Sequence, residues 1–301
     1  MISALLRQAS PPPVPTRAVT HKTRGRGHGP IVRLMSPSDL GVQLKPFVFL
    51  DLFETDLRGM AMPLHPHSGI ATITVLTDGE ARFDDPEAGQ GVLGYGGVEW
   101  MRASGGVWHG KELSAWSSPS IRGFQLWIAL PPELEGATPQ SQYIEAGGTP
   151  TSGPAHVILG AYDGVASRLR APAGITYLLV TLQPGEAWRY QPPEGQSVGW
   201  LALASGGLDV GEGGERLTNG DMAVLEPGEG AVEFRADDES GATLVIGSAV
   251  PHPHPLHLGY YSVHTSAQAL AAGERRIVEL KQQIDAAGDR RTASGSTPVY
   301  R

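Results

Sequence analysis

Two histidines one residue apart are the part of the sequence best suited to chemistry. His65 and His67 precede a run that reads as a strand from residue 70, because β-branched and apolar residues alternate with small ones until Asp78-Gly79, a hairpin signal. If the strand conformation extends back to His65, both imidazoles project from the same face. That arrangement can chelate a transition metal, although a bare His-x-His pair is more often accidental than a metal site.

A third histidine, His109, follows after a stretch of short strands and turns. Three imidazoles meeting inside a small β-barrel would leave coordination positions open, as a catalytic metal requires. We therefore predict a metal site formed by His65, His67 and His109. A second pair, His252 and His254, alternates with prolines that force an extended, unpaired backbone, and it makes a poor buried site.

The composition favours short strands joined by turns, with 40 glycines and 25 prolines in 301 residues. Strand-like segments within residues 31–130 are followed by a similarly spaced set within residues 176–247, so the chain reads as a duplicated β-barrel. The loop 190–195 of the second copy has no histidine, which predicts a barrel without metal. A helix is expected from Thr265 or Ser266 onward. The predicted fold class is therefore all-β, with two tandem barrels and a short C-terminal helix.

The predicted organisation is an extended N-terminal arm (1–23), a metal-binding barrel (24–135), a linker (136–154) and a metal-free barrel that ends in the helix and a polar tail (155–301). The absence of cysteine excludes disulfides and thiolate sites and fits a reducing cytoplasm, where we expect the protein. The net charge of −8 argues against direct nucleic-acid binding. No apolar run reaches the roughly 18 residues that a membrane helix needs.

The chain resembles the pirin family, whose members are bicupins with two cupin-type jelly-roll barrels. The resemblance is carried by residues 46–53 (PFVFLDLF), 63–69 (PLHPHSG), 98–109 (VEWMRASGGVWH) and 123–131 (GFQLWIALP), and it extends from about Arg24 to about Leu280. It implies a metal held by His65, His67 and His109 in the first barrel. The first metal motif departs from the family pattern, because Ser68 replaces an arginine and Ala71 a glutamate.

The family pattern also places a glutamate two residues after the third histidine, as the fourth metal ligand and the base that ionises the substrate. Here that position is Lys111, which cannot ligate a metal while protonated. Glu112 follows it, and a bulge at Gly110 would swing the Glu112 carboxylate inward. Without such a bulge Glu112 faces the other side of the sheet. Lys111 and Glu112 are therefore both candidate catalytic residues, and Glu112 is the candidate fourth ligand.

Two functions remain open. The resemblance implies a flavonol (quercetin) 2,3-dioxygenase that takes dioxygen and an aromatic substrate, with divalent iron first among the metals, then nickel, copper, manganese or zinc. Charged Lys111 cannot serve as the base, but it can hydrogen-bond a phenolate that has already formed. The alternative is a non-enzymatic regulatory pirin that binds a partner protein through its surface, with a degenerate or empty metal site.

Overall fold

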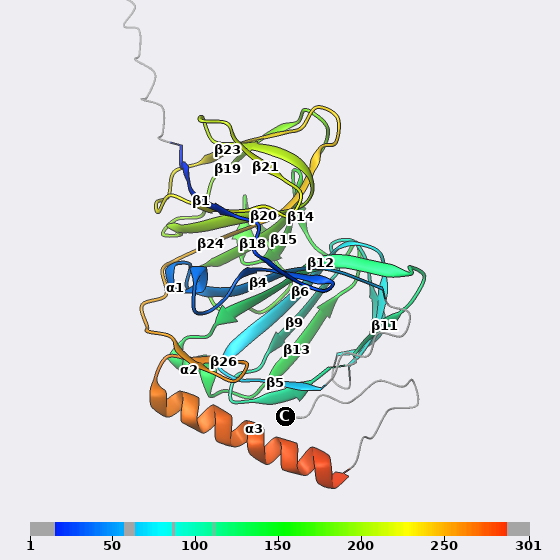
Figure 1. Cartoon of the computed structure of the whole chain (residues 1–301), viewed down its shortest axis with the longest axis vertical. Coiled ribbons are helices and arrows are strands. Elements are labelled where there is room, and N and C mark those ends of the chain that lie inside the picture. The colour runs from blue at the N-terminus through cyan, green and yellow to red at the C-terminus, as the bar shows by residue number, and fades with distance from the viewer. Residues whose placement is uncertain (1–15, 57–63, 86–87, 111, 288–301) are drawn as a thin grey trace, which may run out of the picture.

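The computed structural model describes residues 16–56, 64–85, 88–110 and 112–287. Two stacked β-barrels make up the molecule, with a long helix beneath the first barrel at the bottom of Figure 1. This arrangement confirms the predicted all-β fold with two barrels and a C-terminal helix. The helices are α1 (Leu40–Gln43), α2 (Pro132–Glu135) and α3 (Ala267–Ala287).

The first barrel has one large sheet faced by two small ones. The large sheet has the order β13-β9-β6-β12-β4-β3-β2, opposite the pair β10-β5 and the sheet β11-β7-β8. Its strands are β2 (Arg26–His28), β3 (Ile31–Met35), β4 (Phe47–Asp56), β5 (His65–His67), β6 (Ile70–Asp78), β7 (Ala81–Asp85), β8 (Gly89–Leu93), β9 (Val98–Arg102), β10 (Val107–His109), β11 (Leu113–Ala115), β12 (Ser120–Ala129) and β13 (Gln140–Ile144).

The second barrel is built around one long, irregular strand. The first half of β20 pairs with β22 and β24, and its second half pairs with β21 and β23, with a break in register between Leu203 and Ser205. The barrel's strands are β1 (Val19–Thr23), β14 (Thr151–Ser152), β15 (Ala155–Leu159), β18 (Ile175–Leu182), β19 (Ala187–Tyr190), β20 (Val198–Val210), β21 (Glu215–Thr218), β22 (Met222–Leu225), β23 (Val232–Ala236) and β24 (Ala242–Ala249). A small hairpin, β16 (Ala161–Tyr162) and β17 (Val165–Ala166), lies beside them.

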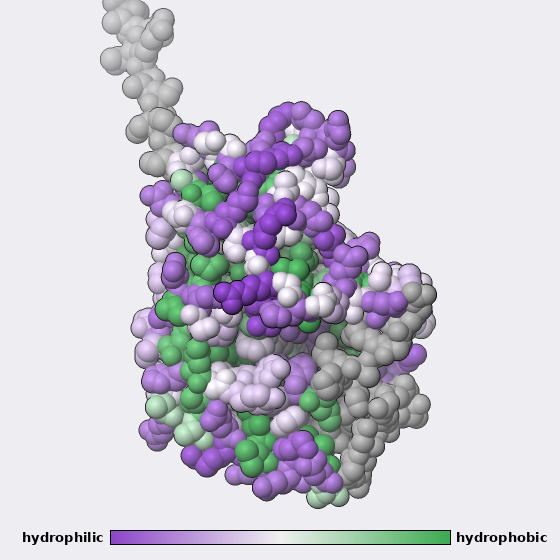
Figure 2. Space-filling model, in the orientation of Figure 1, coloured by the Kyte–Doolittle hydropathy of each residue, from purple (hydrophilic) through white to green (hydrophobic). Residues whose placement is uncertain are grey.

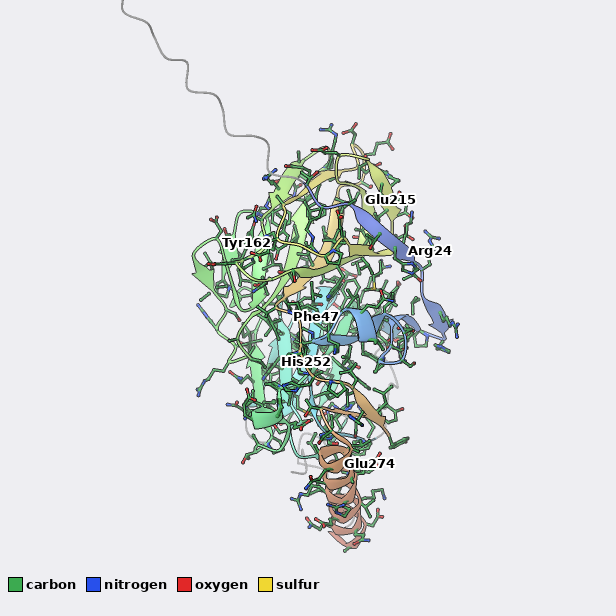
Figure 3. All side chains as sticks on the ribbon, turned by 90° about the vertical axis from the view of Figure 1, so that its left-hand side faces the viewer. Arg24, Phe47, Tyr162, Glu215, His252 and Glu274 are labelled. Atoms are coloured by element: carbon green, nitrogen blue, oxygen red, sulfur yellow. The ribbon has the colours of Figure 1, made fainter. Side chains whose placement is uncertain are left out.

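A shared apolar core joins the large sheets of the two barrels. Trp100 of the first barrel and Trp200 of the second are both fully buried in it. Phe47 packs edge-on against Trp200, with 5.4 Å between the ring centroids, and lies at the middle of the molecule in Figure 3. Aromatic side chains of this size contribute much of the apolar burial at an interface, so the two barrels form one packed body.

Two segments that were predicted as an arm and a linker add strands to the barrels. Residues 19–23, within the predicted arm, form β1 at the edge of the second barrel's sheet, where they pair with β22. Arg17 is buried there and donates hydrogen bonds to the carbonyls of Glu226 and Ser197. In the predicted linker, residues 140–144 form β13, which pairs with β9 of the first barrel. A free strand edge accepts such additions through backbone groups alone, which leave little trace in the side-chain pattern.

The C-terminal segment returns to the first barrel. A hairpin of β25 (His257–Gly259) and β26 (Ser262–His264) lies against β6, and α3 packs on β10 and on that hairpin. The Ser266 hydroxyl accepts a hydrogen bond from the Ala269 amide, as the predicted helix cap requires.

The visible surface is mostly polar. On the face shown in Figure 2, hydrophilic residues dominate over the second barrel and apolar ones form small separate patches. Among the residues described, no helix combines the length and the apolar character needed to cross a membrane.

Candidate metal centre

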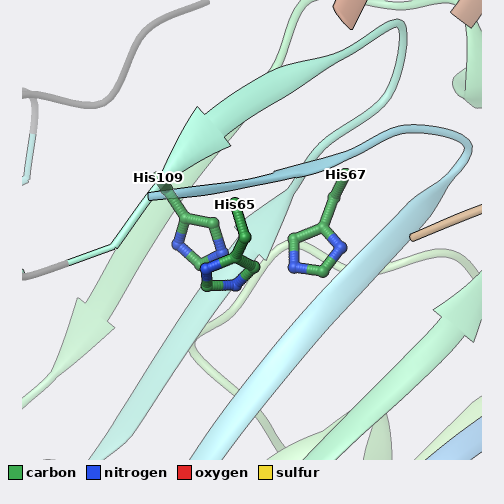
Figure 4. A group of neighbouring side chains, drawn as sticks. All are labelled: His65, His67 and His109. Atoms are coloured by element: carbon green, nitrogen blue, oxygen red, sulfur yellow. The ribbon is translucent and has the colours of Figure 1, made fainter. Parts of the chain in front are cut away.

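The three predicted histidines come together on two short paired strands. β5 and β10 run antiparallel, with His109 opposite His65 and Val107 opposite His67. His65 and His67 share a face because side chains alternate along a strand. The three rings converge in Figure 4, and one nitrogen from each lies within 4.8 Å of the other two. Because an ion bound to imidazoles at about 2.1 Å holds its nitrogens within about 4.2 Å of one another, small ring rotations suffice for chelation.

The hydrogen bonds of the rings leave metal-binding nitrogens free. His67 Nδ1 lies 3.2 Å from the carbonyl oxygen of Tyr261, and a carbonyl can only accept, so this nitrogen carries the proton. Within the described part of the chain, His67 Nε2 and His109 Nε2 are buried and have no hydrogen-bond partner. Unpaired buried polar atoms are rare in folded proteins, and a shared metal ion would satisfy both.

The electrostatic environment keeps the imidazoles of His67 and His109 neutral. Burial, assisted by the neighbouring His65, lowers the pKa of His67 to about 3. Burial also lowers the pKa of His109 well below its usual value, with His65 and His67 adding to the effect. A metal ion needs neutral imidazole ligands, so at neutral pH no proton has to be displaced before it binds. The residues present therefore fit a divalent transition metal.

Glu112 is buried next to the third histidine. Gly110 has φ = +139°, and both carboxylate oxygens of Glu112 accept a hydrogen bond from the Gly110 amide, at 3.0 and 2.9 Å. Glu112 Oε2 lies 3.8 Å from His109 Nδ1, on the opposite side of the ring from the unpaired Nε2. Burial raises the pKa of Glu112 to about 8 despite the Gly110 hydrogen bond. Its role as the fourth ligand stays a prediction, and Lys111 lies outside the described residues.

A row of polar side chains crosses the large sheet of the first barrel. Its members are cross-strand neighbours on β13, β9, β6, β12, β4 and β3, namely Tyr143, Glu99, Thr74, Gln125, Asp51 and Arg33. Tyr143 donates a hydrogen bond to Glu99, and Arg33 pairs with Asp51. Burial raises the pKa of Glu99. The sequence interpretation missed this row, although polar residues at alternate positions, such as Thr72 and Thr74, were its available signal.

An aromatic cleft of about 320 Å³ adjoins the histidines. Its wall includes Phe49 and Trp127, whose rings stack with 4.0 Å between centroids, and the Arg33 guanidinium lies over Phe49. Trp127 and Tyr261 line the cleft and lie 5.0 and 5.9 Å from the His67 ring. The cleft therefore offers an aromatic surface next to the candidate metal ligands.

Trp100 and Trp108, on β9 and β10 before His109 in the sequence, lie away from the cleft. Trp100 is buried between the barrels, and Trp108 donates a hydrogen bond to the Ile277 carbonyl of α3. The pair His252 and His254 lies elsewhere, with 5.3 Å between ring centroids. It belongs to no group of three potential metal ligands among the residues described.

Known proteins share both the fold and parts of the sequence. The Pirin family model matches residues 31–128. A pirin-like protein of Caulobacter vibrioides is 30% identical over 68% of this chain and 74% of its own length. Another from the same bacterium is 33% identical over 144 residues, 52% of its length. A Pseudomonas aeruginosa protein, provisionally named a quercetin 2,3-dioxygenase, is 32% identical over 70% of this chain and 77% of its own length.

Solved structures agree with these relatives. The crystal structure of quercetin 2,3-dioxygenase from Acinetobacter baumannii has a TM-score of 0.77 at 23% identity and covers 89% of this chain and 98% of that one. The bacterial pirin YhhW from Escherichia coli, in complex with nickel(II), has a TM-score of 0.59 at 19% identity and covers 75% and 94%. The fold is thus that of a bicupin with a three-histidine cluster in its first barrel. The chain belongs to the pirin family.

Proposed function

We propose that this pirin is a metal-dependent dioxygenase of the quercetin 2,3-dioxygenase type, acting on a flavonol or a similar aromatic enol. The observation that carries the proposal is the convergence of His65, His67 and His109 beside the aromatic cleft. The provisional name of the Pseudomonas aeruginosa relative supports the same reaction class.

His65, His67 and His109 would hold the divalent ion, with iron as the first candidate and nickel, copper, manganese or zinc as alternatives. A bound ion supplies open positions at which substrate oxygens and dioxygen can be brought together. The Escherichia coli pirin, which shares this fold, was solved in complex with nickel(II), and this supports a divalent ion as the bound metal. The His67 proton stays on Nδ1, which donates a hydrogen bond to the Tyr261 carbonyl oxygen, so this ring can offer a metal Nε2 alone.

The chain's own side chains would orient the substrate and determine where a proton is held. Trp127 and the exposed Tyr261 line the cleft beside His67, where they would contact a planar substrate. Glu112, with its pKa raised to about 8, holds a proton at neutral pH, so in the metal-free protein it is an acid more than a base. The proton of the substrate hydroxyl therefore needs another acceptor at pH 7, or a higher pH at which Glu112 is ionised.

Oxygen consumption tests the activity. Protein reconstituted separately with Fe²⁺, Ni²⁺, Cu²⁺ or Mn²⁺ is mixed with quercetin and monitored with an oxygen electrode. We expect uptake with at least one metal, loss of uptake in His67→Ala and no change in His254→Ala, which alters a histidine outside the site. Metal-loaded protein that consumes no oxygen with any flavonol would overturn the dioxygenase assignment.

A second candidate function is a regulatory pirin that binds a partner protein and performs no catalysis. The observation that favours it is the Glu112 carboxylate, which is bound to the Gly110 amide and lies on the Nδ1 side of His109. In that position it is poorly placed to take a proton from a substrate on the Nε2 side. Metal binding without oxygen consumption is the result that this candidate predicts.

A further inference from the structure

A chain of hydrogen bonds begins directly behind the histidine cluster. Ser68 follows His67 in the sequence and is fully buried. Its Oγ lies 2.9 Å from Ser262 Oγ and 2.9 Å from His264 Nε2. The other ring nitrogen of His264, Nδ1, lies 3.2 Å from Glu135 Oε2. A serine, a histidine and a carboxylate, far apart in sequence, are therefore joined in one buried relay.

The carboxylate end of the relay is firmly held. Glu135, the last residue of α2, accepts hydrogen bonds from the Thr265 amide at 2.9 Å and the Thr265 hydroxyl at 2.7 Å. Together with His264 these contacts occupy both oxygens of the carboxylate. An ionised carboxylate can only accept hydrogen bonds, so His264 Nδ1 donates to Glu135. This hydrogen bond fixes the orientation of the His264 ring.

The same order of groups occurs in serine hydrolases, but here it cannot act on a substrate. Ser68 has no exposed surface, and the backbone of Gly273 in α3 covers it. A Cβ added at Gly273 would lie 2.6 Å from Ser68 Oγ and 2.6 Å from His264 Nε2. A cleft of about 520 Å³ beside the relay is lined by Glu135, His264 and Gly273 but not by Ser68, so a substrate carbonyl in that cleft does not reach the serine. The relay must therefore act through the elements that it connects.

The element that the relay fixes is the turn of the C-terminal hairpin. Ser68 and Ser262 form a parallel bridge, and the Val263 amide donates to the Ser68 carbonyl at 3.2 Å. The turn just before Ser262 contains Tyr261, with φ = +55°, a conformation that is uncommon for a residue other than glycine. This conformation accompanies the hydrogen bond between the Tyr261 carbonyl and His67 Nδ1.

We propose that Ser68, His264 and Glu135 are positioning residues that hold the C-terminal hairpin so that Tyr261 fixes the tautomer and orientation of His67. The proposal rests on the metal site proposed above. Partners of this kind stabilise a ligand in the geometry that the ion needs, and their loss typically weakens metal binding by about 10- to 100-fold. Because the relay acts through Tyr261, we expect an effect near the lower end of that range.

The test compares two buried serines in the full-length protein. Ser68→Ala breaks the relay, whereas Ser248→Ala breaks a similar buried chain in the second barrel, in which Ser248 bonds Tyr190 and Gln196 at 2.6 Å each. Cobalt(II) is titrated into each metal-free protein, and affinity and the visible absorption bands are recorded. We expect about tenfold weaker binding and shifted bands for Ser68→Ala, and wild-type values for Ser248→Ala. Glu135→Gln provides a second break in the relay if Ser68→Ala does not fold.

The outcomes separate this proposal from the metal site on which it rests. Wild-type protein that binds no cobalt would overturn the metal site and the relay together. Wild-type protein that binds cobalt, with unchanged affinity and bands in both Ser68→Ala and Glu135→Gln, would overturn the relay alone. Equal losses in Ser68→Ala and Ser248→Ala would also overturn it, since they would show a general effect of destabilisation.

Discussion

The two barrels have similar frames and opposite interiors. In the second barrel the inward-facing positions of the central strands are apolar, as with Leu178, Leu201 and Leu244, and they form one continuous core. In the first barrel the comparable positions include Thr74 and Glu99, and Glu99 is close enough to Glu112 to help raise its pKa. Both barrels contribute their outer faces to the shared core between them. The barrels differ in the opposite face of each large sheet, which lines the interior of its own barrel.

This contrast assigns a continuous apolar core to the second barrel and the candidate metal site to the first. A buried apolar interior gains roughly 25 cal/mol for each Å² removed from water, whereas buried carboxyl and imidazole groups lose hydration. The first barrel tolerates its polar interior because its large sheet is anchored on the second barrel, and the C-terminal hairpin and α3 cover β6 and β10, respectively. We therefore expect core substitutions in the second barrel to change stability most and substitutions in the first to change metal binding and pH dependence.

The largest expected effect is the loss of a core leucine in the second barrel. Leu201→Ala should lower the free energy of unfolding by about 2–5 kcal/mol, because it removes fully buried methyl groups and leaves a cavity. Thr74→Ala on the inner face of the first barrel should cost clearly less. Urea denaturation followed by tryptophan fluorescence measures both. Equal losses would contradict the contrast between the two interiors.

The next effect concerns the pH dependence of the metal-free protein. The pKa of Glu112 is raised to about 8 from an ordinary 4.5, so between these values the folded protein keeps a proton that the unfolded chain has lost. Stability from this group is complete below about pH 4.5 and falls by roughly 1.4 kcal/mol per pH unit as the pH rises toward 8. Unfolding midpoints measured across this range should fall less steeply in Glu112→Gln than in wild type.

Glu239→Gln, which changes an exposed carboxylate of the second barrel, is the matched control and should follow the wild-type curve. The buried histidines contribute the opposite slope at lower pH, because a neutral His67 must gain a proton as the chain unfolds. The comparison between Glu112→Gln and wild type isolates the carboxyl from that contribution. Superimposable curves would mean that Glu112 titrates normally and that burial does not disfavour its charge.

The smallest effect concerns the position where the family pattern has a glutamate. Lys111→Glu should tighten metal binding by about tenfold, since a carboxylate ligand replaces an ammonium that repels a cation. Competition with a coloured chelator measures the change, and Lys22→Glu in the second barrel serves as the control for added negative charge. An affinity that does not change would show that residue 111 does not face the metal.

Much of the architecture could be predicted from the sequence because it is local. Strand alternation and the hairpin signal at Asp78-Gly79 indicate two barrels without any long-range information. The His-x-His spacing placed two rings on one face, and the expected barrel, together with the pirin resemblance, added His109. The cap of α3 at Ser266 also follows a local rule.

The parts that could not be predicted depend on contacts between distant segments. The addition of β1 to the second barrel uses backbone hydrogen bonds, which any sequence of extended conformation can make. The hydrogen bond from His67 to Tyr261 joins residues 194 positions apart and depends on the unusual backbone of Tyr261. The direction of the Glu112 side chain could not be predicted either, because it depends on the backbone conformation of Gly110 and on the hydrogen bond from the Gly110 amide.

Metal analysis of the two histidine pairs tests the central claim most directly. Protein purified without a histidine tag is loaded with Fe²⁺, Ni²⁺ or Cu²⁺, freed of excess ion and assayed by inductively coupled plasma mass spectrometry. We expect about one ion per chain in wild type and in the His252→Ala, His254→Ala double variant, and almost none in the His65→Ala, His67→Ala double variant. Wild-type protein that remains empty, or a His65→Ala, His67→Ala variant that keeps its ion, would contradict the account.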